Sequence, residues 1–539
     1  MTEQSQTTQR QASVGNIELA GRIIVLAIGL LLLSRNVNGW FTGWREDNSA
    51  LYSIFARNHI QYGLGYTKLF NTWGDTLTAP AQPHRYLNHP PLLSVLVAIP
   101  MFVFGDHEWV ARSVPIAATL GSVLLLMIIV SRLQSPILGL LSGLFYVTLP
   151  VIAYFGRMLD HEAPVQFFSL LMLHGYLQWT GTYGGEYSRK AGALYYALGA
   201  ILGIGTGWAA IIMAGLILAW HVRRIFGNSL RQKSMLWVTI IPAASLTAVI
   251  LHIIWGCRWK IRWLGALFLS RTVGPQHPIP WSEWFSESYV NLRENVSDFG
   301  IAAGVIYLLI TPVILRLRNG KNPFLQKIIH TKMFVTVVLL TTLQGLIWIF
   351  LFRHQSSRHD YWQYFLGPFF AVAIAAVLQW IFSLFSEWMP RAAKPVIVLL
   401  ALLPMPAFAY AYDMLYQYQI ESRRDEVMFF KKLSEVVPPR VPVMVSEKLP
   451  EHSETYGNYT YCWTEPYLTY YINRPLIYST DIKEIESNRE GCAAYIVRLT
   501  EEANMEKLAT ELNAKYEMMQ FDRNVLIFFL NRPKQISRP

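Results

Sequence analysis

Apolar residues in this chain form long blocks, and short loops in which Lys and Arg are frequent separate the blocks. Each block is about 15 to 22 residues long, the length of a helix that crosses a lipid bilayer. The pattern predicts eleven such helices, at about 20–36, 110–131, 136–154, 164–180, 192–204, 207–221, 234–255, 298–315, 333–352, 361–385 and 395–413. We therefore expect a polytopic membrane protein with an all-α membrane domain.

One apolar run is too short for this pattern. Leu92 to Phe104 spans 13 residues and follows Pro90 and Pro91. That length suits a helix that dips into the membrane or lies at its surface. We expect this run to belong to a long first outer loop, about 37–109.

Charge sets the expected orientation. Apolar residues make up 53% of the 539 and charged residues 15%, with a formal net charge of +11. In a soluble chain this basicity would suggest nucleic acid, but here the excess lies in loops between spans, as the positive-inside rule expects. With a cytoplasmic tail at 1–19 and an uncleaved anchor at Ile23 to Leu33, the basic loops fall inside. This predicts a plasma (inner) membrane protein with no nucleic-acid partner.

The same parity places residues 414–539, after the membrane domain at 20–413, outside the cell membrane. This part alternates strand-like runs with helix-like ones: "VPVMVSE", "PLIYSTD", "AAYIVRL" and "NVLIFFL", then "PYLTYYIN" and "MEKLATELNAKYEMM". It predicts a small soluble α/β domain. Cys462 and Cys492 both lie in it, and a disulfide and two unpaired thiols are both open.

Four polar patches fall in the predicted outer loops: "REDN" (45–48), "HRYLNHPP" (84–91), "GRMLDHEAP" (156–164) and "RHQSSRHDYW" (353–362). Ionisable groups near membrane depth are costly unless they pair or line a wet cavity, so the patches are candidates for one functional site. Each patch also has a plainer interpretation. In the order of the patches, these interpretations are a solvated loop, histidines that hydrogen-bond to the backbone, a helix N-cap at 160–162, and basic side chains that snorkel to the membrane surface.

The stretch "WGCRWKIRWLGALFLSR" (255–271) predicts an interfacial amphipathic helix, because tryptophans recur every four residues beside a basic stripe of Arg258 and Arg262. Plain anchoring and a basic rim that recruits an anionic lipid carrier are both open. Arg271, at the end of the stretch, is a further candidate for contact with a phosphate.

The order of these patches resembles a known family. The segments "ALYSIFARNHIQYG", "YLNHPPLLSVLVAIP", "GRMLDHEAPV" and "RHDYWQYFLGPFF" resemble the GT-C membrane glycosyltransferases, specifically the bacterial branch similar to protein O-mannosyltransferases and the lipid A aminoarabinose transferase. The resemblance covers about residues 20–385. It implies a GT-C fold and transfer of a sugar from a polyprenyl-phosphate carrier to a lipid, glycan or protein acceptor on the outer face.

The resemblance also implies an acidic residue in the first outer loop that positions and deprotonates the acceptor. This is chemically sensible, because a hydroxyl or amine that attacks an anomeric carbon must lose a proton. Both Asp47 and Glu46 can match this position, and the sequence does not decide between them. Asp160 matches the second acidic position, with Glu162 beside it.

The residues that the family uses near the phosphate of the lipid carrier are only partly present in this chain. Where relatives carry "EKPP", this chain has Asn88, His89, Pro90 and Pro91, so an acidic residue that is structural or binds a metal is absent and His89 replaces a phosphate-contacting Lys. A divalent metal is therefore a doubtful cofactor. Tyr86 and Tyr361 match tyrosines near the carrier phosphate, and we add as candidates for substrate binding Arg258, Arg358 and His359.

Two other classes of protein are compatible with the pattern. A secondary transporter or flippase would also have about eleven spans, although the sequence shows no convincing inverted repeat and its polar groups gather on one face. A catalytically inactive relative that acts as a scaffold is the other, because Asn88 and the order of Glu46 and Asp47 depart from the family pattern.

Overall fold

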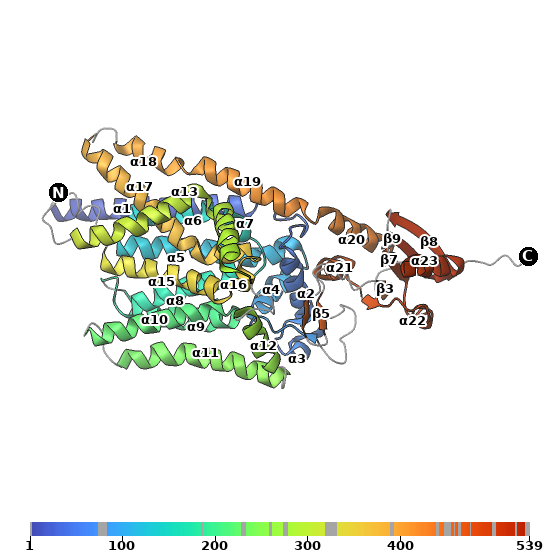
Figure 1. The fold of residues 1–539 in the computed structure, drawn as a ribbon. Helices are drawn as coiled ribbons and strands as arrows, with labels where there is room; N and C mark the ends of the chain where they lie inside the picture. Colours follow the sequence, from blue (N-terminus) through green and yellow to red (C-terminus); the bar gives the residue numbers. More distant parts are fainter. Residues whose placement is uncertain are drawn as a thin grey trace, which may run out of the picture. The chain divides into compact units, whose positions relative to one another are not determined.

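The computed structural model describes residues 3–73, 84–184, 187–227, 233–257, 261–272, 279–317, 331–388, 393–437, 441–446, 454–456, 459–461, 465–474, 476–498, 503–522 and 525–533 (Figure 1). The chain forms two compact units. The first comprises residues 1–39, 87–93 and 112–418, and the second comprises residues 40–86, 94–111 and 419–539.

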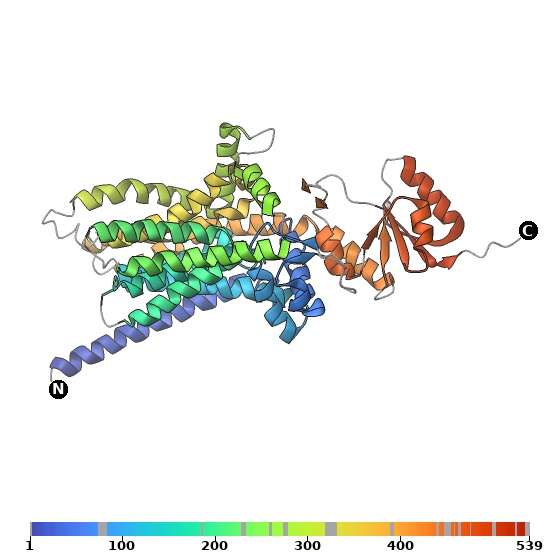
Figure 2. The same ribbon diagram turned by 90° about the horizontal axis from the view of Figure 1, so that it is seen from below.

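The first unit is built from helices that lie side by side, as Figures 1 and 2 show. Their bounds are α1 (Glu3–Leu33), α5 (Glu108–Leu133), α6 (Pro136–Thr148), α7 (Pro150–Phe155), α8 (Glu162–Trp179), α9 (Arg189–Thr206), α10 (Ala209–Phe226), α11 (Lys233–Cys257), α12 (Ile261–Thr272), α13 (Trp281–Leu317), α15 (Lys332–Leu351), α16 (Arg353–Ser356), the 3-10 helix η2 (Asp360–Leu366), α17 (Gly367–Trp388), α18 (Ala393–Leu402) and α19 (Met405–Glu421).

Eight helices of the described residues are long and apolar enough to cross a membrane. They are Asn16–Leu33, Glu108–Leu133, Ala209–Phe226, Met235–Gly256, Trp281–Arg316, Lys332–Leu351, Asp360–Ser386 and Val398–Tyr418. The protein is therefore a multi-pass integral membrane protein, as predicted.

Three of the eleven predicted spans are not among these eight. The predicted span at 136–154 is divided between α6 and α7, because Pro150 begins a new helix. The other two correspond to α8 and α9, which are 18 residues each; α8 carries polar side chains such as Gln166 and His174 along its length. The count of eleven stays a prediction.

The structure describes two helical parts of the amphipathic stretch at 255–271. Trp255 lies near the end of α11, which ends at Cys257, and α12 begins at Ile261. Residues 258–260, among them Arg258 and Trp259, lie outside the described residues. The short run at 92–104 is a helix, α4 (Leu92–Phe104), with Pro100 inside it.

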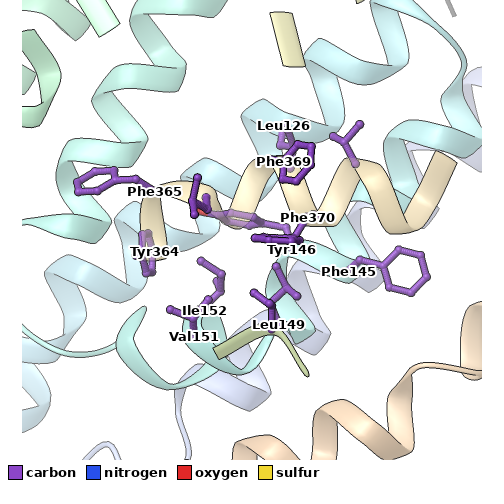
Figure 3. Close-up of a cluster of buried hydrophobic side chains, with 14 of the residues drawn as sticks. Leu126, Phe145, Tyr146, Leu149, Val151, Ile152, Tyr364, Phe365, Phe369 and Phe370 are labelled. Atoms are coloured by element: carbon purple, nitrogen blue, oxygen red, sulfur yellow. The ribbon is translucent and has the colours of Figure 1, made fainter. Parts of the chain in front are cut away.

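The largest core cluster joins α6 and α7 to η2 and α17. Figure 3 shows Tyr146 close to Phe370 in this cluster, and Ile152 next to Val151. Gly367, where α17 begins, allows the close approach, because a Cβ there would lie 2.8 Å from Ile152 Cδ1 and 3.0 Å from the Tyr146 ring. Tyr364 on η2 also shares a 2.9 Å hydrogen bond with Thr119 on α5. This packing fixes η2, which carries Tyr361.

The second unit combines short elements from the first outer loop with the end of the chain. Its elements are α2 (Asp47–Tyr62), α3 (Leu64–Thr67), β1 (Thr72–Trp73), β2 (His84–Arg85), most of α4, α20 (Arg424–Val436), β3 (Val443–Val445), β4 (Glu454–Tyr456), β5 (Tyr459–Tyr461), α21 (Glu465–Ile472), β6 (Leu476–Tyr478), α22 (Ile482–Ser487), β7 (Ala494–Arg498), α23 (Ala503–Lys515), β8 (Tyr516–Asp522) and β9 (Val525–Pro533).

A mixed sheet forms the C-terminal part of this unit, in the order β6-β3-β7-β9-β8. β3 pairs in parallel with β6 and β7, placing Met444 opposite Tyr495, and β9 pairs antiparallel with β7 and β8. Apolar side chains of α23, such as Leu512, join the buried cluster of the sheet. The predicted mixture of strands and helices is confirmed for this part of the chain, whereas a separate domain at 414–539 stays a prediction.

One element of the C-terminal part was predicted wrongly. The run "MEKLATELNAKYEMM" was expected to be one helix, but α23 ends at Lys515 and Tyr516 begins β8. Pairing with β9 along seven residues decides the conformation there, because tertiary contacts override local propensity. Cys492 is buried, and Cys462 lies outside the described residues.

Candidate functional site

The "GRMLDHEAP" patch forms the beginning of α8. Asp160, His161 and Glu162 are all buried, with 3%, 5% and 5% of their surface exposed. Asp160 Oδ1 lies 2.5 Å from His161 Nδ1 and also accepts the backbone N–H of His161 at 2.7 Å. His161 is the N-cap residue of α8, as the N-cap interpretation of 160–162 expects, and Glu162 places an acidic side chain in the first turn, but the His161 side chain makes no capping hydrogen bond.

His89 of the "NHPP" segment packs on this patch. Its ring stacks on the ring of His161 with the centroids 3.7 Å apart and the planes 25° apart. Part of the His89 side chain reaches the surface, yet protein surrounds the rest closely. Burial lowers the pKa of His89 well below its usual value, and positive charge on His161, Arg271 and His359 lowers it further. His89 is therefore a neutral imidazole at neutral pH.

Three polar atoms of this neighbourhood are buried and have no hydrogen-bond partner among the described residues. They are Nδ1 of His89, Nε of Arg271 and Oε2 of Glu162. Native proteins rarely leave such atoms unpaired, because burying them without a partner costs about 1–3 kcal/mol each. Two of the three atoms are potential donors close to positive charge, which suits an anion. The third is a carboxylate oxygen, which suits a hydroxyl, an amine or a cation.

The "RHQSSRHDYW" patch forms α16 and the start of η2. His359 stacks on Trp362 at 4.8 Å, and its Nδ1 lies 2.8 Å from the carbonyl oxygen of Gln355. Tyr361 is buried and packs against Phe155 of α7 at 5.8 Å. Arg358 is exposed and makes no side-chain hydrogen bond or ion pair with any residue that the structure describes.

The first unit therefore gathers a cluster of ionisable side chains, which we call the histidine cluster: His89, Asp160, His161, Glu162, Arg271 and His359. The sequence singled out all of these positions, but it gave no role to the ring of His161 and fixed none for Arg271. A stacked pair of histidines leaves no pattern in the sequence, because its members lie 72 positions apart.

Glu46 and Asp47 lie in the second unit. One carboxylate oxygen of Glu46, Oε2, accepts the backbone N–H groups of Thr42 at 2.9 Å and Gly43 at 3.1 Å. Asp47 is the first residue of α2, where the helix dipole favours a negative charge, and it is buried. The two neighbouring carboxylates thus have different surroundings. The carboxylate of Glu46 stabilises the backbone at residues 42–43 by hydrogen bonds.

Tyr86 also lies in the second unit. Its ring lies 5.5 Å from that of Phe55 and 6.5 Å from that of Tyr52, both on α2, and its backbone N–H donates to Asn71 at 2.8 Å. Tyr86 is therefore part of the aromatic packing that supports α2. Arg258, the remaining sequence candidate, lies outside the described residues.

Asp160, His161 and Glu162 also fit a divalent metal ion. Each offers one ligand atom, and these atoms all lie within 4.8 Å of one another. Mixed imidazole and carboxylate ligands suit Zn²⁺ or Mn²⁺, and Oε2 of Glu162 is a buried oxygen without a partner among the described residues. Asp160 is already paired with His161, so a metal would have to bind a different oxygen or replace that contact.

Comparisons with known proteins agree with the resemblance seen in the sequence. Residues 88–255 match the family described as dolichyl-phosphate-mannose-protein mannosyltransferase. The fold is similar to that of ArnT from Cupriavidus metallidurans bound to undecaprenyl phosphate, with a TM-score of 0.62, 11% identity, and 96% of this chain and 99% of that chain covered. No curated protein matches the chain in sequence.

A second similar structure is the archaeal oligosaccharyltransferase AglB from Archaeoglobus fulgidus, in complex with an inhibitory peptide and a dolichol-phosphate. Its TM-score is 0.54 at 12% identity, and 97% of this chain and 75% of that chain are covered. At such identities the likeness is one of fold. It confirms the predicted GT-C fold, with a C-terminal mixed sheet after the helical membrane part.

Proposed function

We propose that this chain, whose residues 88–255 match the dolichyl-phosphate-mannose-protein mannosyltransferase family, moves a sugar from a polyprenyl-phosphate carrier to an acceptor at the outer face of the membrane. The observation that carries the proposal is the histidine cluster. Nδ1 of His89 and Nε of Arg271, which have no partner among the residues that the structure describes, suit the phosphate of a lipid carrier, the ligand present in the similar ArnT and AglB structures.

In the reaction, a hydroxyl or amine of the acceptor attacks the anomeric carbon of the sugar. The bond from that carbon to the phosphate oxygen breaks, and the polyprenyl phosphate leaves with the electron pair. We assign stabilisation of the leaving phosphate to His89, Arg271, His359 and Tyr361, because charge-assisted hydrogen bonds strengthen as charge develops on the phosphate. The leaving group is already an anion of low basicity, so no general acid is needed there.

We assign uptake of the acceptor's proton to Asp47 and a supporting role to Asp160. Glu46 is the less suitable base, because its Oε2 already accepts two backbone N–H groups. If a divalent metal binds Asp160, His161 and Glu162, it would supply positive charge near the phosphate.

The function is tested by comparing cells with and without the gene, using mass spectrometry of their envelope lipids, glycans and glycoproteins. Loss of one sugar from one acceptor class would identify both products of the reaction. The purified full-length protein should then transfer that sugar from its undecaprenyl-phosphate donor. A transporter would move the lipid across vesicles without forming product, and a scaffold would do neither, so either result would overturn the proposal.

We also propose that the N-terminus is cytoplasmic and that the C-terminal sheet faces outside, because this places the basic loops inside. A cysteine replacing exposed Lys507 on α23 should react with a membrane-impermeant thiol reagent on intact cells. The matched control, Lys190→Cys, lies in a predicted inner loop and should react only after permeabilisation. The opposite result for the pair would reverse the orientation.

The lowered pKa of His89 gives the carrier site a direction of pH dependence. A neutral His89 can gain a proton when an anionic phosphodiester binds, so the complex holds this proton more tightly than the free protein does. Affinity for an undecaprenyl-phosphate sugar should therefore rise as the pH falls from about 8 to about 6, by at most about tenfold per pH unit. The charge of a phosphodiester does not change over this range.

The measurement is the equilibrium binding of the donor to the purified protein at several pH values. His89→Gln keeps a hydrogen-bonding side chain without a titrating ring, and it should flatten the pH dependence of donor binding. An identical pH profile for the wild-type protein and His89→Gln would remove His89 from the carrier site.

A further inference from the structure

The backbone segment just before Asp47 is held by the C-terminal part of the same unit. The hydroxyl of Tyr467 donates to the carbonyl oxygen of Gly43, and the hydroxyl of Tyr471 accepts the backbone N–H of Phe41 at 2.6 Å. Both tyrosines lie on α21, four positions apart, and both are buried. Two tyrosines one turn apart on the same face of α21 therefore hydrogen-bond to residues 41–43.

Helix α20 and the residue before it also contact this segment. The backbone N–H of Arg423, immediately before α20, donates to the carbonyl oxygen of Thr42 at 3.0 Å. The guanidinium group of Arg423 lies 4.5 Å from the ring centre of Trp44, and the ammonium group of Lys431 lies 4.4 Å from that of Trp40. Such cation–π contacts hold the tryptophans that flank residues 41–43.

Almost every backbone polar group of residues 41–43 is thus accounted for. The N–H groups of Thr42 and Gly43 go to Glu46, the N–H of Phe41 goes to Tyr471, and the carbonyls of Thr42 and Gly43 go to Arg423 and Tyr467. A loop normally bonds to water or to itself. Here the partners are Glu46, which is local in sequence, and residues of the C-terminal part, namely Arg423, Tyr467 and Tyr471.

The same helix α21 also fixes α2 itself. Arg57 on α2 donates to the carbonyl oxygen of Tyr470 at 3.3 Å and to Oδ1 of Asn473 at 3.1 Å, and its Nε pairs with Asp106 at 2.5 Å. Tyr470 OH donates to the other oxygen of Asp106 at 3.3 Å. Asp47 therefore starts a helix that α21 holds both just before its first residue and at its third turn.

We propose that Tyr467 and Tyr471 are positioning residues for Asp47, so that the C-terminal part completes the arrangement of the acceptor base as well as following the membrane domain in the sequence. The inference rests on the proposed role of Asp47. Its physical basis is that a displacement of a reacting group by about 1 Å can cost about 10²-fold in rate. The two hydroxyl groups restrict residues 41–43, which lie four to six residues before the carboxylate.

The test uses the full-length protein with Tyr467→Phe and Tyr471→Phe, which delete one hydroxyl and keep the ring. Each should lower kcat by about tenfold or more, with the KM for the lipid donor unchanged, and amide hydrogen exchange should speed up in residues 40–47. Tyr495→Phe is the matched control. Tyr495 is a buried tyrosine of the same C-terminal part whose hydroxyl donates to a backbone carbonyl, that of Ser479, at 2.8 Å. It should change neither kcat nor exchange in residues 40–47.

A thermodynamic cycle separates positioning from general damage. Tyr467→Phe combined with Glu46→Ala should lower kcat by less than the product of the two single effects, because both changes release the same segment. Multiplicative effects, or a kcat no lower than that of Tyr495→Phe, would overturn the inference even if Asp47→Asn still lowered the rate of transfer as expected. If Asp47→Asn transferred sugar at the normal rate, the proposed base would fail first, and the positioning role would fall with it; faster exchange in residues 40–47 would then show only that the tyrosines hold the loop.

Discussion

Asp47→Asn should lower the rate of sugar transfer by about 10² to 10⁴, the usual contribution of a positioned general base. The amide keeps the size of the side chain and most of its hydrogen bonding, but it cannot take up the acceptor's proton. Initial rates are measured with saturating lipid donor in membranes, normalised to protein level by immunoblot. The level should barely change, because the substitution alters one atom of a buried side chain at the start of α2.

Glu46→Gln is the matched neighbour of this change. A glutamine carbonyl oxygen can still accept the N–H groups of Thr42 and Gly43, so we expect less than a tenfold effect, whereas Glu46→Ala should cost more because both N–H groups lose their acceptor. Asp160→Asn should be milder than Asp47→Asn and should also shift acceptor affinity. Near-normal transfer by Asp47→Asn and by Glu46→Gln together would show that neither carboxylate is the base.

Much of the membrane part could be predicted from the sequence because lipid imposes a simple rule. A spanning helix must be long and apolar, and eight predicted spans satisfy this rule in the structure. The rule fails where helices pack on protein instead of lipid. Helix α8 buries most of its side chains against neighbours, so polar side chains such as Gln166 and His174 are tolerated, and its composition no longer identifies a span. Helix α9 buries fewer of its residues and exposes apolar side chains such as Leu194.

Local patterns could also locate the ionisable side chains but not their partners. "NHPP" and "DHEAP" mark His89 and His161 as unusual, yet only the fold stacks the two rings. The contacts of Tyr467 with Gly43 and of Tyr471 with Phe41 join positions more than 400 residues apart. Nothing in the local sequence around a tyrosine indicates such a distant contact. The hydrogen bonds of Tyr467 and Tyr471 to residues 41–43 therefore could not be predicted from the sequence.

Gly175 on α8 should be among the least replaceable residues of the bundle. A Cβ at this position would lie 2.2 Å from the backbone nitrogen of Tyr196 and 2.7 Å from the carbonyl oxygen of Gly192, both on α9. Reciprocal contacts exist along the pair, because a Cβ at Gly192 or Gly199 would lie 2.4 Å from a backbone nitrogen of α8. Helices in membranes associate through such close backbone approach at small residues.

Gly175→Ala should therefore push the two helices apart, with a loss of stability of about 1–3 kcal/mol or more, and Gly175→Leu should prevent recovery of folded protein. The measurement is the temperature at which detergent-solubilised protein leaves its monodisperse peak in size-exclusion chromatography. Gly215→Ala on α10 is the control, since a Cβ there would meet no heavy atom within 4 Å. A Gly175→Ala protein as stable as Gly215→Ala would show that α8 and α9 can separate without cost.

The same variant links packing to chemistry. Helix α8 begins at Glu162, whose neighbour His161 stacks on His89, so a shift of α8 moves the histidine cluster as well as the α9 contact. In Gly175→Ala protein that remains folded, donor binding should weaken in proportion to the loss of stability, while Gly215→Ala should bind normally. Unchanged donor affinity in destabilised protein would mean that the first turn of α8 keeps its place independently of the glycine contact thirteen residues further along the helix.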